Sequence, residues 1–139
     1  MLRSVADMTI RLDLFSFVVA DMARSLQFYR RLGFEIPAGS EAEPHVDVEV
    51  SGGIRVAWDT VETVKSFDPG WTIPTGGHRI APAFLCDSPG DVDRLFAELI
   101  GAGASVHKEP WDAFWGQRYA TVLDPDGNAV DLFAPLPAR

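Results

Sequence analysis

The stretch Arg11–Ile36, RLDLFSFVVADMARSLQFYRRLGFEI, decides the fold. Its first part, Arg11–Val19, is rich in Phe, Val and Leu and predicts a β-strand. Asp21 then stands where a helix N-cap belongs, and the apolar residues after it follow helical spacing. Gly33 is predicted to end that helix, and Phe34–Ile36 to begin a second strand. The predicted order is strand, capped helix, glycine stop, strand.

Two further segments predict a hairpin. HVDVEV (His45–Val50) alternates strictly between polar and apolar residues, which is typical of a half-buried strand. SGG provides the turn, and IRVAWDT (Ile54–Thr60) provides the returning strand. Residues 61–78 hold two Pro, three Gly and few periodic apolar residues, which predicts a long connection. Connections of this length are usually functional or flexible.

The same order of elements then recurs. RIAPAFLCDSPGDVDRLFAELIGAGASV predicts strand, capped helix, glycine stop and strand, and GQRYATVL, DPDGN and AVDLFAP predict another hairpin. An offset of 67 places Phe17 on Phe84, and an offset of 74 places Trp58 on Leu132. The seven extra residues are assigned to Lys108–Gly116. We expect two βαβββ modules in one domain, 1–139: module one at about 10–60, a connection at 61–78, and module two at about 79–135.

Composition narrows the function. The 139 residues are 47% hydrophobic and 23% charged, with a net charge of −8. An acidic chain is a poor partner for nucleic acid and for anionic membranes, so we expect neither. Cys86 is the sole cysteine, which excludes an intramolecular disulfide and a Cys-based zinc cluster and predicts a cytoplasmic location. The apolar run Leu14–Ala20 is too short to span a membrane.

The chain resembles the vicinal oxygen chelate superfamily, which includes glyoxalase I, bleomycin resistance proteins and extradiol dioxygenases. The residues that carry the likeness are VVADMARSLQFYRRLGFEI, DSPGDVDRLFAELIGAGASV and FWGQRYATVLDPDGNAVDLF, and with the hairpins it covers nearly all of residues 10–135. The resemblance implies an α+β fold, with paired modules forming a curved mixed sheet around a cup and helices on its outer face. It also implies a homodimer, with exchanged modules or close packing between chains.

Metal-dependent relatives place His, Gln or Glu at four positions inside the cup. In this chain the corresponding positions are Leu14, Ala57, Asp131 and Ala81, with Ile80 or Pro82 in place of Ala81 if the register differs by one residue. A divalent metal needs three or four converging N/O ligands, so one carboxylate in four is insufficient. His78 would add only a second ligand, and a His78–Asp131–Glu49 site would require a register that breaks the apolar phasing of the repeat. We therefore expect no metal and no other cofactor.

Strand alternation assigns the remaining side chains to faces. Trp58 is predicted to lie in the core, and Asp124 and Asp126 in DPDGN are predicted to be turn formers. Asp47 and Glu49 face either the cup or solvent, and Trp111 and Trp115 either contact a ligand or cover a dimer interface. The predicted ligand-binding residues are Asp131, Asp47, Glu49 and Arg55 for polar contacts, with Trp71, Trp111, Trp115, Tyr119 and Phe133 for stacking.

Aromatic edges with carboxylates suit a planar or cationic organic compound. The leading hypothesis is a metal-independent binding protein that sequesters such a compound, as the drug-binding resistance proteins of the superfamily do. One alternative is a metal-dependent glyoxalase-type lyase or isomerase, or an extradiol dioxygenase. Another is a metal-free enzyme with Asp131 as general base. No catalytic residue is assigned from the sequence, which favours a binding protein over an enzyme.

Overall fold

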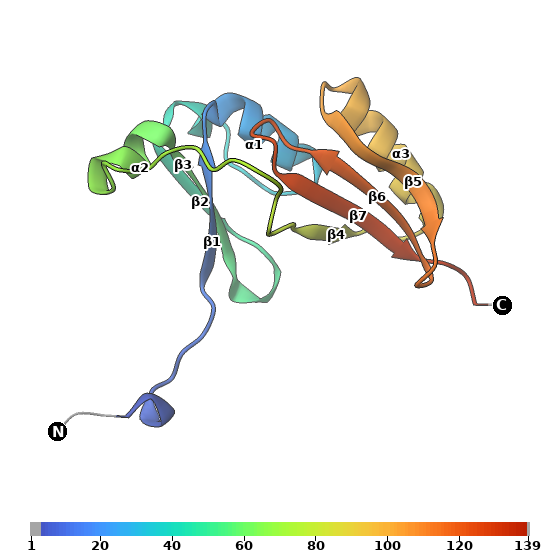
Figure 1. Ribbon diagram of the computed structural model, residues 1–139, viewed down its shortest axis with the longest axis horizontal. Helices are drawn as coiled ribbons and strands as arrows, with labels where there is room; N and C mark the ends of the chain where they lie inside the picture. The colour runs from blue at the N-terminus through green and yellow to red at the C-terminus, as the bar shows by residue number, and fades with distance from the viewer. Residues whose placement is uncertain (1–3, 139) are drawn as a thin grey trace.

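The computed structural model describes residues 4–138, and they form an α+β fold with two mixed sheets (Figure 1). In sheet A the strand order is β1-β3-β2, with β1 (Leu14–Val19) parallel to β3 (Arg55–Thr60) and β2 (His45–Glu49) antiparallel to it. In sheet B the order is β4-β7-β6-β5, from β4 (Ala83–Leu85), β7 (Ala129–Pro135), β6 (Gln117–Leu123) and β5 (Ser105–Ala113).

The helices are α1 (Met22–Arg31), α2 (Val61–Phe67) and α3 (Pro89–Gly101), with short 3₁₀ turns at Val5–Asp7, Ser40–Ala42 and Ser51–Gly53. Helices α1 and α3 lie on the same side of the two sheets in Figure 1, and the short helix α2 lies at the left, against β1 and β3. We call the sides of the sheets that face away from α1 and α3 the open faces. Within residues 4–138, no helix is long and apolar enough to cross a membrane.

The predicted helix ends are confirmed. The side chain of Asp21 accepts a hydrogen bond from the backbone N–H of Arg24 at 3.1 Å, as an N-cap residue does. Ser88 caps α3 in the same way through the N–H of Asp91 at 3.2 Å. Gly33 follows α1 with φ of +95°, a conformation that glycine adopts at no steric cost.

The internal repeat is visible in the strand register. Ser16 lies opposite Ala57 in sheet A, and Ala83 lies opposite Asp131 in sheet B. These pairs are related by the offsets of 67 and 74 that the sequence predicts. Trp58, predicted to be a core residue, is fully buried. The fold class and the pairing of the two modules are therefore as expected.

Two predicted strands differ from the structure. Phe34–Ile36 is irregular, so sheet A has three strands while sheet B has four. The ring of Phe34 packs against Tyr29 instead, and the Ile36 carbonyl accepts from Arg30 Nε at 3.2 Å. The first strand begins at Leu14 rather than Arg11, because its partner β3 begins only at Arg55. The segment before β1 runs away from the body (Figure 1).

The predicted connection 61–78 begins with a helix. Thr60 caps α2 by accepting from the N–H of Thr63 at 3.2 Å. Only Val64 of this helix is buried, which explains why the sequence carries no apolar period there. Residues 68–82 have no regular structure and link α2 to β4.

A buried hydrogen bond joins the two modules in the core. The hydroxyl of Tyr29, on α1, donates to Asp124 Oδ2 at 2.7 Å, and both residues are buried. The ring of Tyr29 packs against Phe17 and Trp58 with centroids 4.9 and 5.7 Å apart. The largest fully buried side chains are those of Trp58, Tyr29, Leu26, Leu99, Leu132, Val19, Val92, Val122 and Val130.

We expect Tyr29→Phe to lower the free energy of unfolding by about 1.5–3 kcal/mol, because it removes a buried hydrogen bond to a charged group. Urea denaturation measures the change. Tyr119→Phe is the matched control, since it removes a hydroxyl that also donates to a carboxylate but lies partly exposed. Equal losses in the two variants would contradict a special role for the buried bond.

Candidate functional site

Asp131 lies on the open face of sheet B and is held by two side chains of β6. Tyr119 Oη donates to its Oδ2 at 2.8 Å, and Thr121 Oγ1 donates to its Oδ1 at 2.7 Å. The pairing of β6 with β7 brings these groups together, because Thr121 lies directly opposite Asp131 and Tyr119 lies opposite Phe133. Burial, together with Asp131, raises the pKa of Tyr119 to about 12, so the hydroxyl stays protonated and remains a donor. The carboxylate is half-buried and fixed in orientation.

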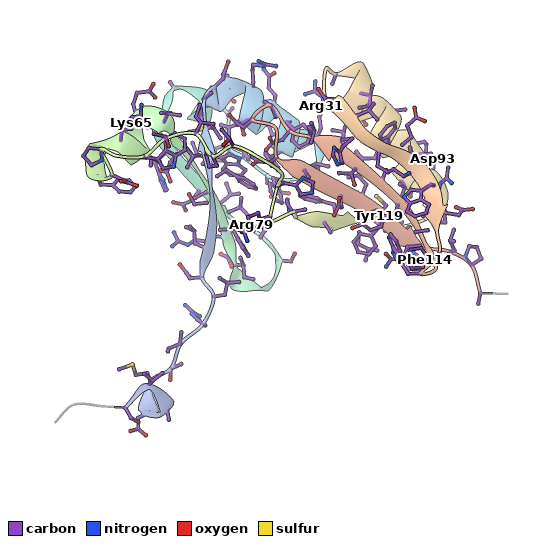
Figure 2. The ribbon with its side chains drawn as sticks, in the orientation of Figure 1. Arg31, Lys65, Arg79, Asp93, Phe114 and Tyr119 are labelled. Carbon is purple, nitrogen blue, oxygen red and sulfur yellow. The ribbon has the colours of Figure 1, made fainter. Side chains whose placement is uncertain are left out.

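An aromatic row extends from Asp131 across sheet B. Phe133 stacks on Tyr119 with ring centroids 6.2 Å apart, and Trp115 meets Tyr119 edge-on at 5.3 Å. Trp111 follows, with its centroid 5.5 Å from Trp115. Figure 2 shows Tyr119 at the same end of sheet B as Phe114, which contacts Trp115 at 4.9 Å. We use the name aromatic row for Phe133, Tyr119, Trp115 and Trp111.

Lys108 modifies one end of the aromatic row. Its ammonium lies 4.9 Å from the centre of the Trp111 ring, within the range of a cation–π contact. One face of Trp111 is therefore already covered by a cation of the protein itself. The rings nearest Asp131 are those of Tyr119 and Phe133, and both are partly exposed.

The open face of sheet A is charged rather than aromatic. His45 bridges two carboxylates, with Nδ1 2.6 Å from Asp59 Oδ1 and Nε2 2.8 Å from Asp47 Oδ2. Arg55 continues the chain of contacts to Asp47 at 3.3 Å and to Asp13 at 2.7 Å. These residues form a ladder of side chains across β2 and β3, which we call the His45 network.

The His45 network shifts the ionisation of its members. Hydrogen bonds to Asp59 and then Asp47 raise the pKa of His45, which favours the imidazolium. The His45 contact in turn lowers the pKa of Asp47. Arg55 lowers the pKa of Asp13 by the same logic. Both ring nitrogens of His45 are occupied, so it is not a free base or a free metal ligand.

The predicted site residues fall into three places. Trp71 lies on neither sheet, in the irregular segment that follows α2. His45 and Asp59 are not among the predicted site residues, because their convergence depends on the β2–β3 register. Sheet B brings together Asp131, Trp111, Trp115, Tyr119 and Phe133, while sheet A holds Asp47, Glu49 and Arg55.

The metal-dependent alternative can be compared with the side chains present. Of the four expected ligand positions only Asp131 carries a ligating group, and both of its oxygens already accept hydrogen bonds. Among residues 4–138, no group of three or more His, Cys, Asp or Glu is arranged so as to hold a metal ion. These residues do not fit a resident metal. That the protein in solution carries no cofactor stays a prediction.

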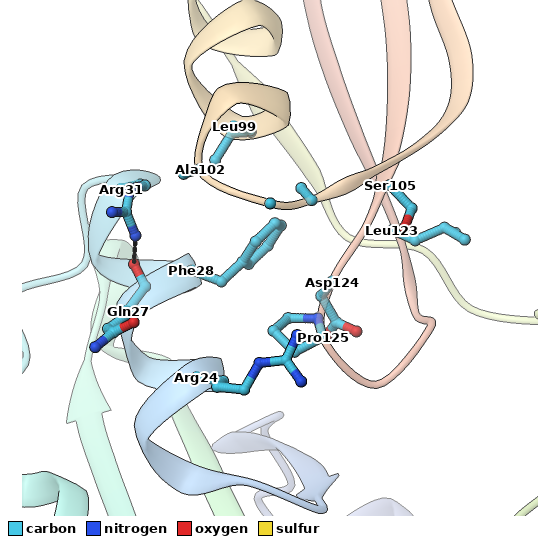
Figure 3. Close-up of a pocket in the computed structure, with 12 residues that line it drawn as sticks. Arg24, Gln27, Phe28, Arg31, Leu99, Ala102, Ser105, Leu123, Asp124 and Pro125 are labelled. Atoms are coloured by element: carbon cyan, nitrogen blue, oxygen red, sulfur yellow. Dashed lines mark hydrogen bonds between the residues drawn. The ribbon is translucent and has the colours of Figure 1, made fainter.

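A small hollow lies on the side of the sheets that faces the helices, between α1 and the turns of module two (Figure 3). Its volume is about 160 Å³, below the roughly 300 Å³ at which small-molecule pockets begin. Arg24 and Arg31 line it with Phe28 and Leu99, and Arg31 Nη1 donates to the Gln27 carbonyl at 3.3 Å. This hollow is too small for a drug-sized ligand.

The His45 network predicts a pH dependence of stability. His45 has a folded-state pKa above its unfolded value of about 6.5, so its stabilising contribution is complete below pH 6.5. The contribution is lost as the pH rises through the folded pKa. We expect NMR titration of the His45 ring to give a pKa above 6.5 that falls in Asp59→Asn.

Asp131→Asn, on the other sheet, is the control for this titration and should leave the His45 pKa unchanged. Urea denaturation at pH 6 and at pH 8.5 should show a smaller loss of stability for Asp59→Asn than for wild type over that interval. An unshifted His45 pKa in Asp59→Asn would refute the assignment.

Comparison with known proteins agrees with this fold. An uncharacterised protein of Mycobacterium bovis is 28% identical over 131 residues, which cover 86% of this chain and 80% of that protein. The structure of a glyoxalase/bleomycin resistance protein/dioxygenase family enzyme from Burkholderia phytofirmans superposes with a TM-score of 0.78 at 21% identity, over 91% of this chain and all of that one. A glyoxalase-related enzyme from Fulvimarina pelagi gives a TM-score of 0.75 at 18% identity, over 89% and 87%. The family model matches residues 11–132, and the chain belongs to the glyoxalase/bleomycin resistance protein/dioxygenase superfamily.

Proposed function

We propose that this protein binds a small planar organic cation on the open face of sheet B, without a metal ion. The observation that carries the proposal is the position of Asp131, a fixed carboxylate beside the rings of Tyr119 and Phe133. In this arrangement the ligand's positive charge meets Asp131 and its planar part stacks on the aromatic row. Sequestration of such a compound, rather than its chemical conversion, is the activity that these groups suit.

The physical chemistry favours a cation over an anion at this place. A half-buried carboxylate attracts a positive group more strongly than a solvated one, because less water screens the pair. Aromatic faces are also negative at their centre and attract cations by up to about 2 kcal/mol when desolvated. The net charge of −8 raises the local concentration of cations around the whole molecule.

Lys108 sets a limit on where the ligand lies. Because its ammonium already covers Trp111, a second cation over that ring would be repelled. The ligand is therefore centred on Tyr119, Phe133 and Trp115, and Trp111 supports Trp115 from the side. In this proposal Asp47, Glu49 and Arg55 of sheet A belong to the His45 network and its surroundings rather than to the ligand.

A homodimer and a cytoplasmic location belong to the same proposal. Phe114 and Trp115 are 91% and 47% exposed and contact one another, and contiguous exposed apolar surface marks interaction sites. A second copy that covers them would turn the open face into an enclosed cup. Sedimentation velocity of wild type and Trp115→Ala distinguishes a ring that closes a dimer from one that contacts a ligand.

The proposal is tested by calorimetric titration with planar cationic dyes such as acridine orange. We expect one dye to bind per chain, and Asp131→Asn to weaken binding about tenfold, the equivalent of about 1.4 kcal/mol. Trp115→Ala should weaken it about fivefold, because a good aromatic contact contributes roughly 0.5–1.5 kcal/mol. Asp112→Asn is the matched control, since Asp112 is an exposed carboxylate of β5 paired with Arg118.

Two outcomes would overturn the proposal. One is equal dye affinity in wild type and Asp131→Asn, with both proteins shown to be folded by circular dichroism. The other is an absence of dye binding together with one equivalent of Zn²⁺, Ni²⁺, Mn²⁺ or Fe²⁺ that survives dialysis. The second result would favour the metal-dependent enzyme instead.

A further inference from the structure

A larger cavity lies where the two modules meet, and it shares no side chain with the open face of sheet B. Its volume is about 780 Å³, within the roughly 300–1,000 Å³ range of small-molecule pockets. One wall is β1, the opposite wall is the irregular segment 71–82, and the turn between β6 and β7 closes one end. We call it the junction cavity.

Aromatic rings from both modules form the inner surface of the junction cavity. Phe17 and Tyr29 stack with centroids 4.9 Å apart, and Phe34 of module one meets Phe84 of module two at 5.6 Å. Trp71 contributes from the segment opposite β1. Such a surface favours an apolar, aromatic occupant over a sugar or a phosphate.

The wall formed by residues 72–81 is weakly attached. Within the described part of the chain, no hydrogen bond involves these residues. The segment is fixed at one end where Trp71 N–H donates to the Asp68 carbonyl at 3.0 Å, and at the other where the Pro82 carbonyl accepts from Asp131 N–H at 2.9 Å. His78 adds a ring contact with His107 at 5.5 Å. A wall with few hydrogen bonds opens at low cost, which gives a ligand a route of entry.

One polar group of the cavity lacks a partner. Asp126 Oδ1 accepts from the Ala20 N–H at 2.9 Å, whereas Oδ2 is buried and has no hydrogen-bond partner among residues 4–138. An unpaired buried oxygen costs free energy, but its burial keeps it out of contact with the open space of the cavity. Burial, with a contribution from nearby Asp124, raises the pKa of Asp126, as expected for a carboxyl group that lacks solvent.

We infer that the junction cavity is a second binding site, which takes an apolar aromatic compound. The rings of Phe17, Phe34 and Phe84 contact the body of the compound, and Trp71 covers it from the segment opposite β1. The inference stands apart from the cation site, because the two sites share neither residues nor ligand chemistry.

The probe for this site is N-phenyl-1-naphthylamine, a neutral aromatic amine with one N–H whose emission rises in apolar surroundings. We expect saturable binding of one molecule per chain. Trp71→Ala should weaken it about fivefold, in line with one lost aromatic contact. Ala81→Trp should block the cavity and reduce affinity at least tenfold.

The matched controls are Trp111→Ala and Asp131→Asn, which make the same kinds of change on sheet B and should leave probe affinity unchanged. Urea denaturation establishes that each variant is folded. The inference fails if the probe does not bind, or if Trp71→Ala and Ala81→Trp bind it as wild type does. It also fails if Trp111→Ala abolishes binding, which would place the probe on sheet B. If wild type binds the probe but does not bind the dye, only the cation site is refuted.

Discussion

The carboxylate of Asp124 is the contact on which the arrangement of the two modules depends. It accepts the hydroxyl of Tyr29 from α1 and, within its own turn, the backbone N–H groups of Asp126 and Asn128 at 2.9 and 2.8 Å. Asp126 extends the connection by accepting from Ala20 at the end of β1. A buried charge is tolerated only when its lone pairs are satisfied, and here four donors satisfy them. The turn that the sequence presents as DPDGN therefore does more than reverse the chain.

The repeat produces two similar sheets with different open faces. An offset of 74 relates His45 to Tyr119, and Asp59 to Phe133, so the His45 network occupies the positions that the aromatic row occupies in sheet B. The sides that face the helices are apolar in both modules, because each must pack against a helix. The open faces carry no such constraint. One backbone design thus presents a charged face and an aromatic one, and only the second combines a carboxylate with stacking surfaces.

Elements set by local chemistry could be predicted from the sequence, while elements set by pairing could not. Asp21 and Gly33 end α1 through their own side-chain and backbone properties, and the alternation of His45–Val50 indicates a strand. The segment Phe34–Ile36 has strand composition, but Phe34 turns inward to Tyr29 and no partner strand forms. Likewise, nothing in the sequence places the Lys108 ammonium over Trp111, because that contact depends on the irregular β5–β6 register.

The turn between β6 and β7, whose Asp124 contacts module one, also determines which side chains reach the open face of sheet B. Asp124 N–H donates to the Asn128 carbonyl at 2.9 Å, and Gly127 provides a positive φ of +84° that closes the turn. This geometry fixes the register of β6 against β7. A slip of one residue would move Asp131 to the helix side and bring Val130 or Leu132 to the open face. The burial of those two side chains opposes the slip, so the same packing that stabilises the fold holds Asp131 between Tyr119 and Thr121.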